Sequence, residues 1–336
     1  MIRVAINGFG RIGRCALRQI RQRTDMKVVA INDLTDAMDL AYLYKYDSVH
    51  RTLGEAIGYD ENSIIFQDDK IKVYKETDPS KLPWGLLEVD GVLACTGVFT
   101  SGEKAKAHLE AGAKKVIISA PAKDEVKTIV YSVNDKRITS EDKIISAASC
   151  TTNCLAPVLK VLDDAFGVES GFMSTVHAVT NDQETLDIPH KKGIASRRGR
   201  SALLNIIPTS TGAASAIGNL IPKLDGKLDG TSYRVPVGDG SIIDLSVLVS
   251  KEVTVEEVNE AFRSKNSEVL KLVTVPLVSS DIIGTTTSAI VDASLTKVVP
   301  MEGKTMVKVS AWYDNEWSYT AQMLRTAARL FEEQVW

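Results

Sequence analysis

Arg3-Val4-Ala5-Ile6-Asn7-Gly8-Phe9-Gly10-Arg11-Ile12-Gly13 is the stretch of sequence that decides the fold. Its apolar start predicts a short strand, and the apolar spacing that follows predicts a helix ending near Gln22. Between them, Gly8 permits a tight turn, Gly10 lets a ligand approach the backbone, and Gly13 lets the helix pack closely on the strand. Phosphates bind well at such a helix N-terminus. The stretch therefore predicts a dinucleotide-binding βαβ unit.

An acidic residue follows at the spacing that this motif requires. The apolar run 27–31 predicts a second strand, which ends at Asn32-Asp33. A carboxylate at this point accepts hydrogen bonds from the adenosine ribose hydroxyls and repels a phosphate on that ribose. No arginine directly follows Asp33, so the sequence predicts NAD rather than NADP. Asp33 can also cap the next helix, and the two roles are compatible.

Two further apolar runs extend the predicted sheet. Residues 91–95 and 115–119 read as strands on either side of a helix at 104–112. Alternating strands and helices are typical of a doubly wound parallel sheet. The loops at Thr96-Gly97 and at Ser119 leave these strands at their carboxyl ends, where such sheets hold ligands. We predict a Rossmann-type α/β domain over residues 1–149, to which a C-terminal helix at 316–336 returns.

A cysteine stands at the start of the next predicted helix, in Ser146-Ala147-Ala148-Ser149-Cys150-Thr151-Thr152-Asn153-Cys154-Leu155-Ala156-Pro157. Ser149 is a candidate N-cap, and Gly167 ends the helix. The positive end of the helix dipole favours a thiolate at Cys150. Position alone leaves a buried, inert cysteine as the alternative. Cys150 and Cys154 form a single pair without nearby histidines, which is a poor zinc site, so no metal is expected.

Beyond this helix, strand patterns dominate the chain. They lie at 171–177, 232–237, 242–250, 272–278 and 306–313, with one helix at about 254–264. We predict a catalytic and oligomerisation domain of α+β type at 150–315, with a mostly antiparallel sheet. His177 ends the first of these strands, and a base with a pKa near 7 suits a thiol nucleophile. A structural histidine is the alternative, because the sequence does not show that Cys150 and His177 touch.

Polar and basic residues that suit anions follow His177. Hydroxyls, backbone amides and arginine forks are what phosphate binding needs. The candidates are Thr180, Asp182, Thr211, Gly212 and Arg234, together with a basic stretch that contains His190, Lys191, Lys192, Arg197, Arg198 and Arg200. The basic stretch is otherwise a solvated loop or a patch for an acidic partner.

Length, composition and charge exclude several classes of protein. The chain has 336 residues, 44% hydrophobic and 25% charged, which is ordinary for a globular protein of two domains. Its net charge of −3 gives no general attraction to nucleic acid or an anionic membrane. No apolar run approaches the ~20 residues that span a bilayer. Four scattered cysteines and a start without a signal peptide predict a reduced, cytoplasmic protein.

The chain resembles one family along its whole length, the phosphorylating glyceraldehyde-3-phosphate dehydrogenases. The resemblance rests on motifs that occur in the family's order. They are 6–14, Lys45-Tyr46-Asp47-Ser48, Ser119-Ala120-Pro121, 149–157, 177–183, 208–214, Arg234-Val235-Pro236 and 312–317. It implies a glycolytic enzyme that oxidises and phosphorylates glyceraldehyde 3-phosphate with NAD and inorganic phosphate, through a thiohemiacetal and a thioester.

The resemblance also implies roles for individual residues. Cys150 would be the nucleophile and His177 the base that activates it. The substrate's phosphate would be held by Thr180, Asp182 and Arg234, and inorganic phosphate by Ser149, Thr151, Thr211 and Gly212. Arg198 is our choice among Arg197, Arg198 and Arg200 for a further phosphate contact. The expected cofactor residues are Asn7, Gly8, Gly10, Arg11, Ile12, Gly13, Asp33, Thr96, Gly97 and Ser119, with Asn315 orienting the nicotinamide amide and Tyr319 beside it.

Family members are homotetramers in which the loop at 181–205 covers a neighbour's cofactor, so a homotetramer without a membrane or an obligatory nucleic-acid partner is expected. The chain departs from the family where His50-Arg51-Thr52-Leu53 replaces the usual glycine and arginine, and where Val237-Gly238-Asp239-Gly240 replaces a turn with threonine and asparagine. The related erythrose-4-phosphate dehydrogenases are the nearest rival. A non-catalytic protein that binds RNA or another protein through 191–200 is a rival from another class.

Overall fold

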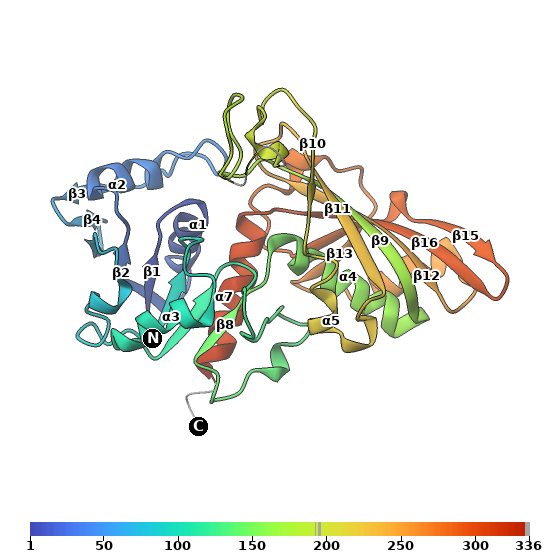
Figure 1. The fold of residues 1–336 in the computed structure, drawn as a ribbon, viewed down its shortest axis with the longest axis horizontal. Coiled ribbons are helices and arrows are strands. Elements are labelled where there is room, and N and C mark those ends of the chain that lie inside the picture. The colour runs from blue at the N-terminus through green and yellow to red at the C-terminus, as the bar shows by residue number, and fades with distance from the viewer. Residues whose placement is uncertain (192, 194–195, 333–336) are drawn as a thin grey trace. The chain divides into compact units, whose positions relative to one another are not determined.

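The computed structural model describes residues 1–191, 193 and 196–332 (Figure 1). The remaining residues, among them Lys192 of the basic stretch and the last four of the expected C-terminal helix, lie outside the described part. The chain divides into two compact units. Unit 1 contains Met1–Tyr131, Asp135–Ser149 and Thr320–Trp336, and unit 2 contains Ser132–Asn134 and Cys150–Tyr319.

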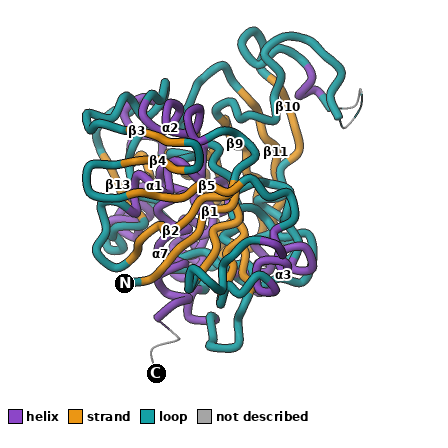
Figure 2. Tube along the Cα trace, turned by 90° about the vertical axis from the view of Figure 1, so that its left-hand side faces the viewer, coloured by secondary structure: helices purple, strands orange, loops and turns teal. Residues whose placement is uncertain are grey.

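Unit 1 is built on an eight-stranded sheet. Its order is β3-β4-β5-β2-β1-β6-β7-β8, and Figure 2 shows β5, β2 and β1 side by side. The strands from β5 to β8 pair in parallel, and only the β3-β4-β5 edge is antiparallel. The strands are β1 (Ile2–Asn7), β2 (Met26–Asn32), β3 (Gly58–Asp60), β4 (Ser63–Ile65), β5 (Lys70–Tyr74), β6 (Gly91–Ala94), β7 (Lys115–Ile118) and β8 (Ile144–Ser146).

Helices cover both faces of this sheet. Successive side chains of a buried strand point to opposite faces, so each strand contributes to two cores. Val4 and Ile6 of β1 belong to one core, together with side chains from α1 (Arg11–Ile20), α2 (Ala37–Lys45) and α7 (Trp317–Glu332). Ala5 belongs to a second core, with Trp84 and with Ala105 of α3 (Gly102–Glu110). This is the doubly wound arrangement that the sequence predicts.

Unit 2 is built on a second, mostly antiparallel sheet. Its order is β10-β11-β9-β12-β16-β14-β13, and β15 pairs with β16. Only β11–β9 and β13–β14 are parallel pairs. Figure 1 shows the long strands β9, β11 and β12 running side by side. The strands are β9 (Val168–His177), β10 (Ile207–Ser210), β11 (Leu228–Arg234), β12 (Ser241–Val249), β13 (Leu270–Val273), β14 (Ala289–Asp292), β15 (Lys297–Met301) and β16 (Lys304–Tyr313).

One face of this sheet is covered by α4 (Cys150–Phe166), which contacts β9, β12, β14 and β16. The strict alternation of buried and half-buried residues along β12 is the pattern of a sheet with one covered face. Helix α4 continues through Pro157 and ends before Gly167, whose φ of +71° suits glycine. Two shorter helices, α5 (Ile217–Leu220) and α6 (Val255–Arg263), complete the unit, and Thr254 caps α6 in a capping box.

The predicted fold class is confirmed, and two predicted strands are wrong in their limits. The strand expected at 232–237 lies at 228–234, because Asp229 and Gly230, which resemble turn residues, pair with Phe172 and Met173 of β9. The strand expected at 272–278 ends at Val273, before Pro276, which has no N–H for a ladder.

Candidate active site

Unit 1 contains a cavity of about 420 Å³ at the carboxyl ends of β1, β2 and β6. Five residues expected from the sequence to hold a cofactor line it, namely Asn7, Gly8, Gly10, Asp33 and Thr96. The sequence motifs did not indicate the other residues that line this cavity, which are Asn32, Leu34, Glu76, Thr77, Cys95, Val98 and Phe99. Most of these follow β2, β5 and β6, so strand order was the only signal that pointed to them.

The glycines of this cavity fit a dinucleotide for separate reasons. Gly8 has a φ of +95°, and a Cβ there would lie 2.7 Å from the backbone nitrogen of Thr96. A Cβ on Gly13 would lie 2.2 Å from the carbonyl oxygen of Gly8. A Cβ on Gly10 would meet nothing within 4 Å, so this exposed backbone is open to a pyrophosphate. The residues present therefore fit a bound dinucleotide.

The carboxylate of Asp33 is placed at the edge of this cavity. One oxygen accepts the backbone N–H of Phe9 at 2.7 Å, and the other accepts that of Thr35 at 3.0 Å. These bonds fix its orientation at the end of β2 and leave lone pairs for ribose hydroxyls. The arrangement is the one that the sequence predicts for an NAD-type ribose.

Other predicted cofactor residues of unit 1 do not line the cavity. Arg11 forms a bidentate ion pair with Asp47, at 2.6 and 3.1 Å. Ser119 donates its hydroxyl hydrogen to the Ala94 carbonyl at 3.0 Å, Gly97 makes a turn with φ of +70°, and the half-buried Ile12 packs on the core. Their predicted contact with the cofactor stays a prediction.

In unit 2, the thiol of Cys150 faces an imidazole. Cys150 is the first residue of α4, and its Sγ lies 3.4 Å from Nε2 of His177 at the end of β9. The two residues are 27 positions apart, so the packing of α4 on β9 brings them together. A thiol and a base at hydrogen-bond distance are the arrangement of an activated nucleophile.

The other ring nitrogen of His177 fixes its tautomer. Nδ1 lies 2.7 Å from the carbonyl oxygen of Ala178 and 3.0 Å from Nη1 of Arg234. Nη1 of Arg234 already donates to the Ala178 carbonyl at 3.0 Å and to Thr180 Oγ1 at 2.9 Å, which uses both of its hydrogens. Nδ1 therefore carries the ring hydrogen and donates it to Ala178. The lone pair of Nε2 is then free to accept the thiol proton.

Burial opposes charge on both reacting groups. It lowers the pKa of His177 to about 3, with the Arg234 charge adding to the effect. Burial likewise raises the pKa of the Cys150 thiol, and the nearby Arg234 charge offsets only part of this. The helix position thus does not by itself produce the thiolate that the sequence analysis expects. Each group alone therefore favours its neutral form, and the thiolate forms when the thiol proton passes to His177.

A polar network that suits an anion lies beside His177. Arg234 donates to Thr180, and Thr180 and Arg198 both hydrogen-bond to the carboxylate of Asp182. Burial would raise the pKa of Asp182, but Thr180 and Arg198 hold it below its usual value. The network contains two guanidinium groups and one carboxylate, so it carries an excess positive charge. Arg234 Nε and Gln183 Nε2 are buried donors that have no partner among the described residues, and an anion could accept hydrogen bonds from them.

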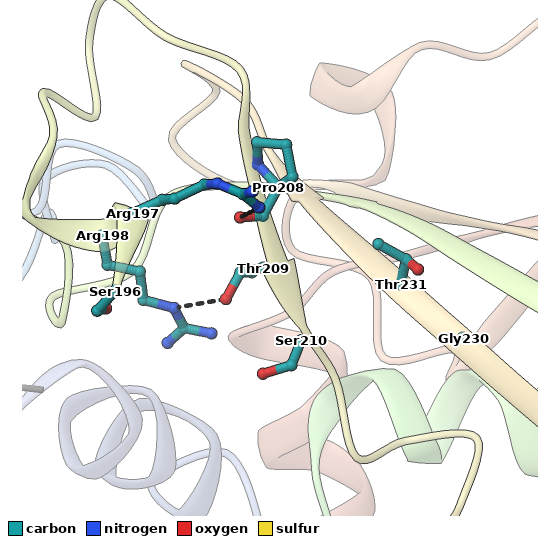
Figure 3. Close-up of a pocket in the computed structure, with 8 residues that line it drawn as sticks. All are labelled: Ser196, Arg197, Arg198, Pro208, Thr209, Ser210, Gly230 and Thr231. Atoms are coloured by element: carbon teal, nitrogen blue, oxygen red, sulfur yellow. Dashed lines mark hydrogen bonds between the residues drawn. The ribbon is translucent and has the colours of Figure 1, made fainter. Parts of the chain in front are cut away.

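Three arginines of the basic stretch differ in their contacts. Arg198 donates from Nε to Thr209 Oγ1 at 3.2 Å, and Figure 3 shows this bond beside Pro208 and Ser210. Arg197 reaches the carbonyl oxygen of Pro208 at 3.4 Å, and the exposed Arg200 pairs with Asp187 at 2.6 Å. Only Arg198 joins the network of Asp182. The geometry therefore favours Arg198 among the three.

The residues expected to hold a second phosphate are more dispersed. Thr151 follows Cys150 in the first turn of α4, and Ser149 directly precedes it. The hydroxyl of Thr211 accepts the N–H of Ala213 at 3.2 Å, and Gly212 is exposed. Within the described residues, Thr211 and Gly212 form no hydrogen bond with Cys150 or His177.

The structure also reveals polar residues that sequence reasoning missed. The buried Tyr313 hydroxyl lies 2.9 Å from Thr151 Oγ1 and 2.8 Å from Thr175 Oγ1. Its ring packs edge-on against His177, with 6.0 Å between the centroids. Ser241 donates its hydroxyl hydrogen to Asn315 at 2.7 Å. Tyr319, which is predicted to lie beside the nicotinamide, is also buried. Only the position of these residues at strand ends could have indicated them.

Comparisons with known proteins agree with this geometry. A family model described as the NAD binding domain of glyceraldehyde 3-phosphate dehydrogenase matches residues 2–102. A second model, described as the C-terminal domain of the same enzyme, matches residues 149–315. NAD is therefore the cofactor of this fold, and the two matches together cover most of the chain.

Curated relatives match over almost the whole chain. The glyceraldehyde-3-phosphate dehydrogenase of Clostridium acetobutylicum is 54% identical over 328 residues, covering 98% of both chains. That of Clostridium pasteurianum is 53% identical over 97% of both chains, and that of Thermotoga maritima is 54% identical over 99% of this chain and 100% of its own. With its cofactor cavity, its paired thiol and imidazole and these matches, the chain belongs to the glyceraldehyde-3-phosphate dehydrogenase family.

Proposed function

We propose that this protein oxidises glyceraldehyde 3-phosphate with NAD and conserves the energy as an acyl phosphate, using Cys150 as the nucleophile. The observation that carries the proposal is the 3.4 Å approach of Cys150 Sγ to a His177 ring whose Nε2 is free to accept a proton. The membership of the chain in the family supports the substrate. The residue roles below are part of the proposal.

The first step is attack of sulfur on the aldehyde carbon. The thiol proton passes to Nε2 of His177, a C–S bond forms, and the carbonyl electrons move to oxygen. The resulting imidazolium and a backbone N–H near Cys150 stabilise that oxyanion. Return of the proton from Nε2 to the oxygen gives a thiohemiacetal. Thus His177 serves first as base and then as acid.

The second step converts the thiohemiacetal into a thioester. NAD, when bound, supplies the acceptor for the hydride that leaves the carbon. The hydroxyl proton returns to Nε2 of His177 as the C=O bond re-forms. Asp33 and the Gly8–Gly13 turn would hold the adenosine and pyrophosphate, and Asn315 the nicotinamide amide. The energy of oxidation is thereby kept in the C–S bond.

The last step is attack of a phosphate oxygen on the thioester carbon. A C–O bond forms, the C–S bond breaks, and the sulfur leaves as a thiolate that recovers its proton from His177. Two anion sites are needed, one for the phosphate of the sugar and one for the attacking phosphate. We assign Thr180, Asp182 and Arg234 to the first, and Ser149, Thr151, Thr211 and Gly212 to the second. Arg198, through Asp182, supports the first site, and fixing a remote phosphate orients the aldehyde for attack.

We further propose a homotetramer that works in the cytoplasm. A cluster of exposed apolar side chains, Leu203, Leu204 and Ile206, ends the loop that covers a neighbour's cofactor in the family. Exposed apolar clusters of this kind mark contacts with other chains. All four cysteines are free thiols, as in a reducing compartment. None of the helices in the described residues is long and apolar enough to cross a membrane.

The direct test measures NADH formation from glyceraldehyde 3-phosphate, with phosphate present and then withheld. We expect sustained turnover only with phosphate, and a burst of at most one NADH per subunit without it, because the thioester then persists. Phosphate-independent turnover at the full rate would contradict the proposal. Mass spectrometry of enzyme quenched without phosphate should find the acyl adduct on Cys150.

Two further arms separate the rivals. Erythrose 4-phosphate should give a kcat/KM at least tenfold below that of glyceraldehyde 3-phosphate, and a reversal of that order would favour the four-carbon activity. A protein that forms no NADH but binds RNA with a steep salt dependence would instead have the non-catalytic role.

A further inference from the structure

A short buried line of hydrogen bonds connects Asn315 with the strand that ends at His177. Asn315 follows β16 and is only 5% exposed. Its Oδ1 accepts the hydroxyl of Ser241 at 2.7 Å. Ser241 is fully buried, begins β12 and pairs with Tyr313 across the sheet. Its Oγ in turn accepts the backbone N–H of Ala178 at 3.0 Å. All of these residues lie in unit 2.

The direction of each bond follows from which groups can only donate. The Ala178 N–H has no lone pair, so Ser241 must accept from it. The hydroxyl has one hydrogen, and in the described residues Asn315 Oδ1 is the acceptor that receives it. The amide of Asn315 is consequently fixed with its oxygen toward Ser241 and its nitrogen turned away.

A fixed amide presents only one kind of hydrogen-bonding group. Ser241 donates to one lone pair of Oδ1 and holds that oxygen on its own side, so the end of the amide that is turned away from Ser241 carries the two hydrogens of Nδ2. No described residue accepts a hydrogen bond from that nitrogen, and its hydrogens are not sealed from solvent. A ligand group held at this end of Asn315 must therefore be an acceptor. A group that could only donate would leave both partners unsatisfied.

We propose that Ser241 is a specificity-determining positioning residue, which fixes the amide of Asn315 so that it donates. Asn315 would then hold the nicotinamide by the oxygen of its carboxamide group rather than by the NH₂ of that group. This inference rests on the proposed function, which assigns the nicotinamide to Asn315. Ser241 itself touches neither cofactor nor substrate and acts through Asn315.

The same line ties cofactor selection to the catalytic imidazole. Ala178 uses its N–H for Ser241 and its carbonyl oxygen for Nδ1–H of His177. The N–H of Ala178 thus sets the direction of the hydrogen bond between Ser241 and Asn315, and the carbonyl oxygen of Ala178 sets the tautomer of His177. The coupling runs through backbone atoms that a side-chain substitution at 241 leaves in place. Removal of the Ser241 hydroxyl should therefore alter cofactor selection without altering the reactivity of Cys150.

The test compares three probes by calorimetry on the full-length protein. NAD carries the whole carboxamide, 3-acetylpyridine adenine dinucleotide keeps the carbonyl oxygen but lacks the NH₂ group, and ADP-ribose has no nicotinamide. Wild type should bind the first two with Kd values within about threefold of each other, since both offer the acceptor that Asn315 needs. In Ser241→Ala the amide can rotate, and a carboxamide can satisfy either orientation whereas the acetyl group cannot. We expect the Kd ratio of acetylpyridine analogue to NAD to rise about tenfold.

Three controls make the outcome specific. The Kd of ADP-ribose should stay within twofold in Ser241→Ala, as should the rate at which iodoacetamide alkylates Cys150. Ser310→Ala removes another buried hydroxyl, which donates to Asp244 on the same sheet, and should leave all three Kd values unchanged. In turnover, Ser241→Ala should raise the KM for the acetylpyridine analogue relative to that for NAD, while the KM for the aldehyde stays the same.

Two results would overturn the inference. In one, the ratio of the two Kd values is unchanged by Ser241→Ala. In the other, ADP-ribose is weakened as much as the acetylpyridine analogue, which would mean that Ser241 acts through the fold. Asn315→Ala separates this inference from the proposed function. If that variant loses NAD affinity while Ser241→Ala leaves the ratio of the two Kd values unchanged, only the role of Ser241 is wrong. If Asn315→Ala binds NAD normally, the placement of the nicotinamide is wrong as well.

Discussion

At the scale of single residues, the reactivity of Cys150 depends on its partner more than on its place in a helix. Burial raises the pKa of the thiol and lowers that of His177 to about 3, so each group alone is neutral near pH 7. Each ion stabilises the other once the proton has crossed the 3.4 Å gap, and the pair titrates as a unit. The helix dipole and Arg234 then support a thiolate that His177 creates.

This leads to a prediction for His177→Asn. Asparagine fills similar space but cannot take the thiol proton, so we expect iodoacetamide to alkylate Cys150 about tenfold more slowly at pH 7. Because only the raised pKa of the thiol then controls ionisation, the rate should recover only at strongly alkaline pH. The measurement is the alkylation rate against pH, with Cys150→Ser as the blank. A profile identical to that of wild type would remove His177 from the pair.

Arg51 offers a second test at this scale. Its φ is +67°, in the left-handed region where a residue with a Cβ is strained. Its carbonyl oxygen accepts from the buried Arg18 at 3.1 Å, which holds the strained conformation. Arg51→Gly should raise the free energy of unfolding by about 0.5–1 kcal/mol. Urea denaturation measures this, and Arg51→Ala, which keeps the Cβ, should show no gain.

The sequence predicted the chemistry of individual residues better than their contacts. Cys150, His177 and Asp33 were recognisable because each has a required residue type at the end of a predicted element. Ser241 and Tyr313 were not, because a serine or tyrosine in a strand is ordinary and only the pairing of β12 with β16 gives it a partner. The preference for Arg198 over Arg200 likewise depended on a loop whose path no local pattern specifies.

At the scale of elements, an ion pair in unit 1 joins the start of α1 to the segment that follows α2. Arg11 begins α1, and Asp47 follows α2 and also accepts the backbone N–H groups of Val49 and His50 at 2.9 Å. Burial alone would raise the pKa of Asp47, but Arg11 and these amides lower it to about 2. The bond fixes the start of the helix that bears the glycine motif.

The pH dependence of this ion pair has a definite sign. A carboxyl with a depressed pKa in the folded state stabilises the protein above its unfolded pKa near 4, and the contribution disappears as the pH falls toward 2. Asp47→Asn should therefore lower the free energy of unfolding by up to about 2 kcal/mol at pH 7, with less of a difference at pH 3. Chemical denaturation at both values tests this. An equal difference at pH 7 and pH 3 would contradict the ionic contribution.

The C-terminal helix makes a close contact within unit 1. A Cβ on Gly91 at the start of β6 would lie 1.8 Å from Cζ of Phe331 in α7. Gly91→Ala should therefore lower the free energy of unfolding by about 1–3 kcal/mol, because the buried ring has to move. Phe331→Leu in the same chain should recover part of the loss. If the two substitutions are simply additive in a double-mutant cycle, the contact does not limit this position.

Elements with a strong hydrophobic pattern could be predicted from the sequence, whereas elements whose limits depend on strand pairing could not. The buried strands β1, β2, β6 and β7 were found because continuous apolar runs separate them from turn residues. Strand β10 contains Pro208 and has an edge position, so its pairing with β11 gave no local signal. The limits of β11 shifted for the same reason, since Gly230 is a strand residue only because Met173 lies opposite it.

At the scale of the whole molecule, association with other copies of the chain is the remaining structural prediction. Leu203, Leu204 and Ile206 are 59%, 78% and 69% exposed, and they lie at the end of the loop at 181–205 that we propose to contact a neighbour. Burying a leucine stabilises an interface by about 1.5–3 kcal/mol, whereas burying a glutamate without a partner costs more than that. If the wild-type protein is the proposed tetramer, Leu204→Glu should therefore give a lower molar mass than wild type in light scattering at micromolar concentration. It should also raise the KM for NAD, if a neighbour covers the cofactor.

Leu86→Glu is the matched control, because Leu86 in unit 1 is 85% exposed but far from that loop in sequence. The Leu86→Glu variant should therefore have the same molar mass as wild type. A wild-type protein that is monomeric under these conditions, or a Leu204→Glu variant that stays tetrameric, would show that these side chains do not hold the copies together.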